Sequence, residues 1–135
     1  MIERLPENDL QRALYSRITG DVATPLYDDV PEDASYPYIV FGDLRDSFSE
    51  HKDAHTPEVL VELWVMSAGQ GAKESVDIAG AVLASITRER LEIENDWHVI
   101  DAQRESFETV RTVEMSGVIN REGRLVIRFE LEDTR

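Results

Sequence analysis

The sequence contains no cysteine, and this absence removes several kinds of chemistry at once. Among its 135 residues there is no thiol to act as a nucleophile, to form a disulfide or to bind a metal. No apolar run comes near the roughly 20 residues that a membrane-spanning helix needs. The first residues, MIERLPEND, lack the basic and apolar regions of a secretory signal peptide. We therefore expect a soluble protein, made in a reducing cytoplasm, with no membrane partner.

Positive charge is also scarce. The chain has 14 lysines and arginines against 28 aspartates and glutamates, which gives a formal net charge of −14. A broad nucleic-acid groove needs basic side chains to neutralise phosphates, so this balance argues against specific binding of DNA or RNA. It does not exclude a place close to DNA, because an acidic surface repels the phosphate backbone and lets DNA pass without adhesion.

What is present is the composition of a folded chain. Hydrophobic residues make up 41% of the sequence and charged residues 31%, a balance typical of globular rather than disordered proteins. The length suits one compact domain with a modest core. We see no internal repeat and no second unit, so residues 1–135 are expected to form a single domain.

Two segments have the hydrophobic period of an amphipathic helix. Over residues 7–20, Leu10, Leu14 and Ile18 recur every four residues, so one face of this helix is apolar. Within residues 67–90 a second helix follows a glycine-containing turn and has an apolar stripe along one side. The stripe consists of Ala72, Val76, Ala79, Leu83 and Ile86, widened by Ile78 and Val82. Each helix therefore has one face to bury.

Four segments have the composition or the alternation of strands, at residues 36–44, 58–66, 97–110 and 124–132. The third is expected to bend or bulge near Ser106. In the second and fourth, alternate side chains divide between two faces. The apolar face has Val59, Val61, Leu63, Val65, Leu125, Ile127, Phe129 and Leu131. The more polar face has Glu58, Leu60, Glu62, Trp64, Met66, Val126, Arg128, Glu130 and Glu132.

The order of elements is helix, strand, strand, helix, strand, strand. Neighbouring strands joined by turns favour antiparallel hairpins, and two one-sided helices are expected to cover one side of the sheet. The predicted fold class is α+β: a two-layer sandwich with an antiparallel sheet of about four strands and two amphipathic helices on one face. The expected core is Leu10, Leu14, Ile18, Val59, Val61, Leu63, Val76, Leu83, Ile86, Ile127 and Phe129.

An acidic cluster, Asp28, Asp29, Glu32 and Asp33, precedes the first strand. A metal or acid–base site needs carboxylates that converge from different elements into a cleft that excludes water. These four lie in one short polar segment that contains Pro31, which is typical of a turn. We interpret the cluster as a solvated turn rather than a reaction centre.

No other set of residues predicts catalysis, a metal or a cofactor. His51 and His55 have the i, i+4 spacing of a zinc site, with Glu50 and Asp53 nearby, but their surroundings predict a polar loop over residues 45–57 rather than a helix. This loop is expected to be mobile in the free subunit and to become ordered on assembly. His98 follows Trp97 at the start of a strand. Three serines, Ser67, Ser75 and Ser116, lack the context of a nucleophile.

Trp64 is the most informative single residue, because it lies on the more polar face of the clearest strand. One interpretation is a partly covered core residue, and the other is an anchor for a protein partner, since aromatic residues and methionine are enriched at interfaces. The residues predicted for an interface are Trp64, Leu60, Met66, Phe48 and Tyr36.

Three stretches, taken in order, resemble a known family. They are LQRALYSRITGD, LYDDVPEDASYPYIVFGD and VELWVMSAGQGAKESVDIAGAVLASI, followed by a weaker similarity over SGVINREGRLVIRFEL. Together they are similar to the tail-completion proteins, or tail terminators, of long-tailed phages and prophages. None of these motifs is catalytic, and the resemblance rests on their order.

The resemblance implies an α+β fold, no enzymatic activity and no cofactor, and a ring, usually a hexamer, that caps the tail tube, stops its polymerisation and docks to the head connector or stopper. The implied partners are further copies of the chain, the tail tube protein and the connector, in a virion assembled in the bacterial cytoplasm. DNA would pass through without specific binding. The predicted lumen residues are Glu58, Glu62, Arg128, Glu130 and Glu132. Two alternatives stay open: a neck or head–tail adaptor protein of the same virion, and a small ligand-binding or enzymatic α+β domain.

Overall fold

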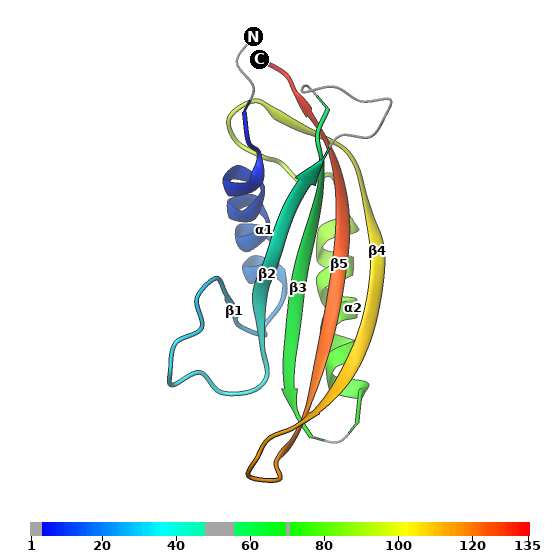
Figure 1. Ribbon diagram of the computed structural model, residues 1–135. Coiled ribbons are helices and arrows are strands. Elements are labelled where there is room, and N and C mark those ends of the chain that lie inside the picture. The colour runs from blue at the N-terminus through cyan, green and yellow to red at the C-terminus, as the bar shows by residue number, and fades with distance from the viewer. Residues whose placement is uncertain (1–3, 48–55, 70) are drawn as a thin grey trace.

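A five-stranded sheet forms the centre of the computed structural model, which describes residues 4–47, 56–69 and 71–135 (Figure 1). The strands lie in the order β1-β2-β3-β5-β4. Their bounds are Leu26–Tyr27 for β1, Tyr38–Ser47 for β2, Glu58–Ala68 for β3, Trp97–Val113 for β4 and Ile119–Asp133 for β5. The α+β class is thus confirmed, with the main strands in the predicted places.

The prediction of a purely antiparallel sheet of about four strands was wrong in detail. A fifth strand, β1, pairs in parallel with β2, with Leu26 opposite Ile39 and Tyr27 opposite Val40. The other three pairings are antiparallel. Two residues are too few to show any period in the sequence, and their pairing depends on the buried Leu26 side chain reaching the core beside Ile39.

Both helices, α1 (Glu7–Asp21) and α2 (Lys73–Thr87), lie on one side of the sheet. In Figure 1 the strands pass in front of α2, so the viewer faces the side without helices. Helix α1 contacts β1 and β2, whereas α2 contacts β3, β4 and β5. The predicted two-layer arrangement, with two amphipathic helices on one face, is therefore the one observed.

The core between these layers follows the predicted alternation of β3 and β5. The apolar-face residues of both strands are buried, as are Leu10, Leu14 and Ile18 of α1. Strand β4 shifts register between Arg104 and Ser106, which confirms the expected bulge near Ser106. A second shift lies between Val99 and Asp101.

The face of α2 was predicted incorrectly at one position. Val76, expected in the core, is 47% exposed, and Leu83 is only partly buried. The buried residues of α2 are Ser75, Ala79, Val82, Ser85 and Ile86. The helix approaches the sheet where Gly123 has no side chain, and a Cβ added to Gly123 would lie 3.4 Å from the Cβ of Ser75. The Phe107 ring lies closer still, at 3.1 Å from such a Cβ, so the buried Ser75 packs close to the sheet beside it. The Ser75 hydroxyl donates to the Ala72 carbonyl at 3.0 Å.

Arg4, ahead of α1, and Asp133, at the end of β5, come together beside the start of β4. Trp97 is buried, and its indole N–H donates to Asp9 in α1 at 3.1 Å. The guanidinium of Arg4 stacks on the Trp97 ring at 4.2 Å and forms an ion pair with Asp133 at 2.7 Å. The hydrogen bond from Arg4 outweighs desolvation and holds the pKa of Asp133 well below its usual range. In the part of the chain that the structure describes, no helix is long and apolar enough to cross a membrane.

Candidate assembly surface

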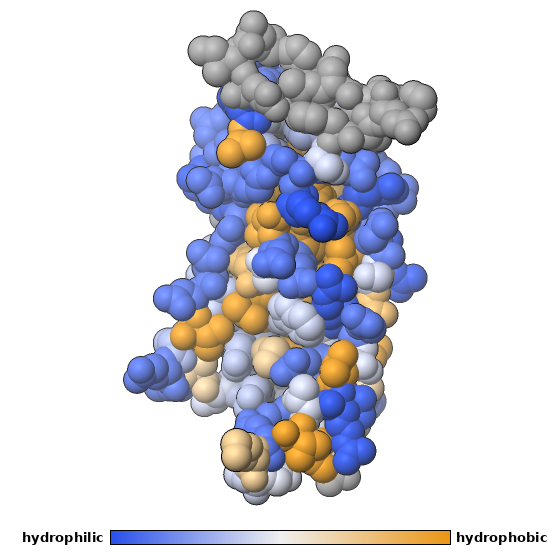
Figure 2. Space-filling model, in the orientation of Figure 1, coloured by the Kyte–Doolittle hydropathy of each residue, from blue (hydrophilic) through white to orange (hydrophobic). Residues whose placement is uncertain are grey.

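The side of the sheet opposite the helices carries the even-numbered residues of β3 and β5, and we call it the open face. Register places Glu58 opposite Glu130, Leu60 opposite Arg128, Glu62 opposite Val126, Trp64 opposite Arg124, and Met66 opposite Glu122. Figure 2 shows this side, where apolar patches lie among strongly hydrophilic ones. The open face therefore brings together the predicted lumen residues and three of the predicted interface residues.

A hydrogen-bonded network occupies the middle of the open face. The indole N–H of Trp64 donates to Oε1 of Glu62 at 2.8 Å, and Nε of Arg124 donates to Oε2 at 2.5 Å. The backbone N–H of Asp43 reaches the same carboxylate at 3.4 Å. Burial alone would raise the pKa of Glu62, but the bonds from Trp64 and Arg124 outweigh it, so the pKa is lowered.

Gly42 provides the space for this carboxylate. A Cβ at position 42 would lie 2.2 Å from Oε1 of Glu62, closer than any real contact. The register of β2 against β3 also shifts between Phe41 and Leu44, next to this glycine. The network thus depends on a missing side chain in one strand and a bulge beside it, and the spacing of charges in the sequence could not reveal either feature.

Glu62 is therefore on the open face, as predicted, but it is not a free charge. Its side chain is 14% exposed and is paired with Arg124. Arg128 is less closely paired: it donates to Gln103 at 3.0 Å and lies 3.9 Å from the Glu105 carboxylate. Further carboxylates of the face lie along the flanks of the network: Glu58, Glu122 and Glu130 are half-buried, and Glu132 is exposed.

Tyr36, another predicted interface residue, belongs to a group of three tyrosines at the edge of the open face. Its ring stacks on Tyr38 with 5.5 Å between centroids, and Tyr38 packs edge-on against Tyr27 at 5.8 Å. Tyr36 remains 41% exposed. The sequence showed the tyrosines of YPY but gave no sign that Tyr27 joins them, because that contact depends on β1. Phe48 lies outside the described residues.

The acidic cluster occupies the loop between β1 and β2. Asp28, Asp29, Glu32 and Asp33 are all exposed there. Across residues 4–47, 56–69 and 71–135, no group of three His, Asp or Glu side chains converges as a metal site would require. His51 and His55, with Glu50 and Asp53, lie outside the described residues.

The serines and the remaining histidine have structural places. Ser67 is buried and donates to the Arg121 carbonyl at 3.0 Å. Ser75 donates to the Ala72 carbonyl at the start of α2. Ser116 is exposed in the β4–β5 turn, and His98 is exposed near the start of β4. None of these side chains is placed beside an acid–base partner in the described part of the chain.

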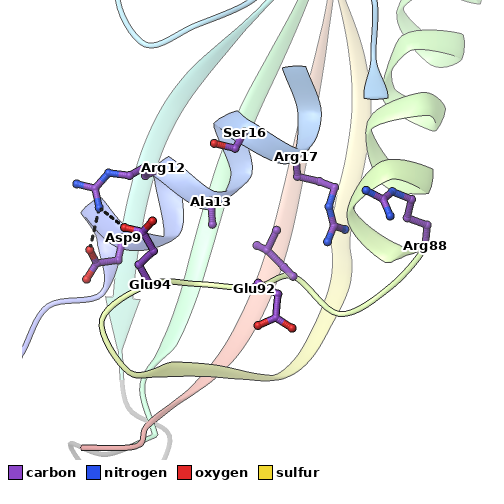
Figure 3. Close-up of a pocket in the computed structure, with 9 residues that line it drawn as sticks. Asp9, Arg12, Ala13, Ser16, Arg17, Arg88, Glu92 and Glu94 are labelled. Carbon is purple, nitrogen blue, oxygen red and sulfur yellow. Dashed lines mark hydrogen bonds and ion pairs between the residues drawn. The ribbon is translucent and has the colours of Figure 1, made fainter. Parts of the chain in front are cut away.

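A hollow of about 400 Å³ lies between α1 and the connection that follows α2 (Figure 3). Most of its charged groups already have partners. Arg17 donates to the carbonyls of Ser85 and Glu89, at 2.9 and 3.2 Å, and so closes the end of α2. Arg12 is paired with Asp9 at 3.3 Å. We interpret this hollow as a joint between elements rather than a site for a ligand.

Glu7, in the first turn of α1, shares a hydrogen bond with Asp46 near the end of β2. Burial, and then this bond to a second carboxyl, raise the pKa of Glu7 to about 7 from the ordinary 4.5. The folded protein therefore binds this proton more tightly than the unfolded chain does. The stabilising contribution is complete below pH 4.5 and is lost as the pH rises through 7.

We expect Glu7→Gln to remove this dependence. The free energy of unfolding of the variant, minus that of the native protein, should increase between about pH 5 and about pH 8. Urea unfolding midpoints at the two pH values measure the difference. Glu92→Gln, at an exposed position, is the matched control. An equal effect of Glu7→Gln at both pH values would show that the Glu7 proton is not linked to folding.

Comparison with known proteins identifies the class of molecule to which this fold and face belong. Residues 12–121 match the family described as tail completion protein gp17. Because the match spans most of the sequence, the chain belongs to this family. It is thus a structural component of phage tails and virions rather than an enzyme, and the resemblance noted in the sequence is confirmed.

Two solved structures share the fold. A chain of the virion of a native gene transfer agent particle superposes with a TM-score of 0.73 at 20% identity, covering 93% of this chain and 96% of that one. The gp17 protein of bacteriophage SPP1 superposes with a TM-score of 0.59 at 20% identity, covering 98% and 95%. At this identity the likeness establishes the fold alone. The search of curated proteins found no significant match.

Proposed function

We propose that this protein closes into a homo-oligomeric ring, a hexamer, that caps the tail tube, ends its polymerisation and forms the tail side of the head–tail junction. Membership of the tail-completion family supports the tail as the place of action. The observation that carries the proposal is the one-sided sheet, in which both helices cover one face and leave an acidic face for the interior of a ring. Its partners are its own copies, the tail tube protein and the head connector or stopper, and assembly takes place in the bacterial cytoplasm.

The charge of the open face suits a passage for DNA. Glu58, Glu122, Glu130 and Glu132 lie on it, whereas Arg124 is tied to Glu62. A lumen lined by such faces repels phosphates, so DNA slides through with little adhesion. Tyr36, at the edge of the sheet, supplies apolar surface that a neighbouring copy covers on assembly. Trp64, Leu60 and Met66 lie within the face itself, so a partner that covers them must enter the lumen, as a segment of the tail tube or connector protein would.

The function is tested by electron microscopy of particles that lack the protein. A terminator of tail growth leaves overlong tails or tails without heads. An adaptor of the neck would instead leave tails of normal length and heads that leak DNA. The second result would replace the proposed role with the adaptor role within the same virion.

The lumen is tested by reversing charge at Glu58 and Glu132, which lie outside the central network. We expect the double variant Glu58→Lys, Glu132→Lys to fold and assemble, to slow DNA ejection and to bind DNA in a manner that weakens with salt. Ejection kinetics and DNA binding at low and high salt provide the measurement.

The matched control places the same charge change on the helix side, as Glu74→Lys with Glu92→Lys, both exposed positions. This variant should eject DNA normally. If the two double variants behave alike, the open face does not line the passage.

A further inference from the structure

The outer edge of β4 is open, because β5 is its only neighbour in the described sheet. Its first half is protected by the two register shifts, but from Ser106 to Val113 the pairing with β5 is regular. An unprotected regular edge is a template for contact with another chain. In this half Val110 is 40% and Val113 is 62% exposed, so the edge is apolar as well as free.

The same half of β4 carries an unused positive charge. Arg111 is exposed, and no ion pair involves it within the described ranges. Just beyond it, the β4–β5 turn exposes Met115 completely. We call residues 106–118 the hairpin end. It combines apolar surface with a free guanidinium in a chain of strongly negative net charge.

The opposite edge of the sheet offers the complementary surface. There the loop over residues 28–37 exposes the stacked ring of Tyr36 beside four carboxylates. No ion pair neutralises these carboxylates among the residues that the structure places. We call this segment the acidic tyrosine loop. In Figure 1 the loop projects at the lower left of the sheet, and the β4–β5 turn forms the lowest point of the molecule.

The two surfaces lie at the same height along the strands. Val110 is opposite Glu122, Glu122 is opposite Met66, and Met66 is opposite Tyr38, so one row of the sheet joins Val110 to the residue on which Tyr36 stacks. Both Val110 and Tyr38 are on the open face, because side chains in one cross-strand row share a face.

Strand direction agrees with a contact between copies. Three antiparallel pairings, β2–β3, β3–β5 and β5–β4, separate β2 from β4 in the sheet. Three reversals of direction leave β2 and β4 antiparallel to each other. A rotation about an axis along the strands preserves their directions, so β4 of one copy meets the β1–β2 edge of the next in an antiparallel sense. Because the two surfaces differ, the contact is head-to-tail, which is the kind of contact that a cyclic ring with more than two subunits requires.

We propose that the hairpin end of each copy packs on the acidic tyrosine loop of the next. Val110 lies against Tyr36 on the open face, and Arg111, which the register places on the other side of β4 with Arg121 and Ser67, faces the loop's carboxylates from that side. This inference rests on the ring proposed above and assigns its subunit contact. The two glutamates of the hairpin end are engaged within the subunit: Glu108 lies 3.7 Å from Arg124, and Glu114 accepts a hydrogen bond from Asn120 at 2.8 Å. Arg111 is therefore the charged group of the hairpin end that remains for the carboxylates of the acidic tyrosine loop, which gives that loop a role in recognition rather than in chemistry.

The absence of native cysteine makes a clean test possible. The full-length chain carrying Tyr36→Cys and Val110→Cys is assembled into tails and treated with a short bis-maleimide. We expect a ladder of cross-linked species that ends at the subunit number of the ring. Tyr36→Cys and Val110→Cys on separate chains, mixed, should give dimers only. Ile100→Cys, 43% exposed at the other end of β4, replaces Val110→Cys as the control and should give no ladder with Tyr36→Cys.

A second comparison tests the charge. Arg111→Glu, introduced into the double-cysteine chain, should reduce the ladder, whereas Arg90→Glu, also exposed and without an ion pair in the described residues, should not. Cross-linking of Val110→Cys alone would reveal a two-fold contact between β4 edges and would overturn the inference. Rings without the ladder would also overturn it, while the terminator role would stand. The two proposals can also fail separately in the opposite way. If the double-cysteine protein gives the ladder, but particles that lack the protein have tails of normal length, the contact is preserved and the terminator role is rejected.

Discussion

Replacing Phe129 with alanine is expected to lower the free energy of unfolding by about 3–5 kcal/mol. The side chain is completely buried at the centre of β5, opposite Val59 of β3 and Ala102 of β4. Removing the ring leaves a cavity in the core, because the surrounding sheet and helices can relax into it only in part. Since a small domain is stable by about 5–15 kcal/mol in total, this loss threatens folding.

Urea denaturation of the purified subunit measures the Phe129→Ala effect. Val118→Ala, at a half-exposed position of the β4–β5 turn, serves as the control and should change stability by less than about 0.5 kcal/mol. A loss below about 1 kcal/mol for Phe129→Ala would contradict the placement of this face of β5 in the core.

The second large effect is expected at Trp64. If it anchors a partner, Trp64→Ala should weaken assembly by about 2 kcal/mol or more per contact. Its indole N–H is already used within the subunit, on Glu62, so only the apolar part of the ring is available to another chain. Because β3 is a central strand, a partner segment must lie across the open face to reach it.

The two roles of Trp64 are separated by measuring unfolding and assembly for two variants. Trp64→Phe keeps most of the apolar ring but removes the donor to Glu62, so it should retain assembly better than Trp64→Ala. Sedimentation of the subunit with tails reports assembly, and urea unfolding reports the stability of the subunit. If Trp64→Ala lowers only the stability of the subunit, Trp64 is part of the internal network and not an anchor.

The candidate surface shows what a one-dimensional pattern can reach. Alternation in β3 and β5 placed Glu58, Glu62 and Trp64 on one face, and the structure agrees. The pattern could not show that Trp64 and Arg124 donate hydrogen bonds to Glu62, because that arrangement needs a residue without a side chain, Gly42, in the neighbouring strand. Whether these residues meet a partner remains a prediction that the experiments above address.

The sequence by itself determined the features that depend on neighbours along the chain. Burial of alternate residues in β3 and β5, and of every fourth residue in α1, follows from the geometry of a strand and a helix. The tertiary structure decided what depends on distant segments. It paired β1 with β2, which brought Tyr27 to Tyr38, and it rotated α2 so that Ser75 rather than Val76 meets Gly123. It also placed Val110 and Tyr38 in one row at opposite edges, because strand order and register arise only when all the strands pack together.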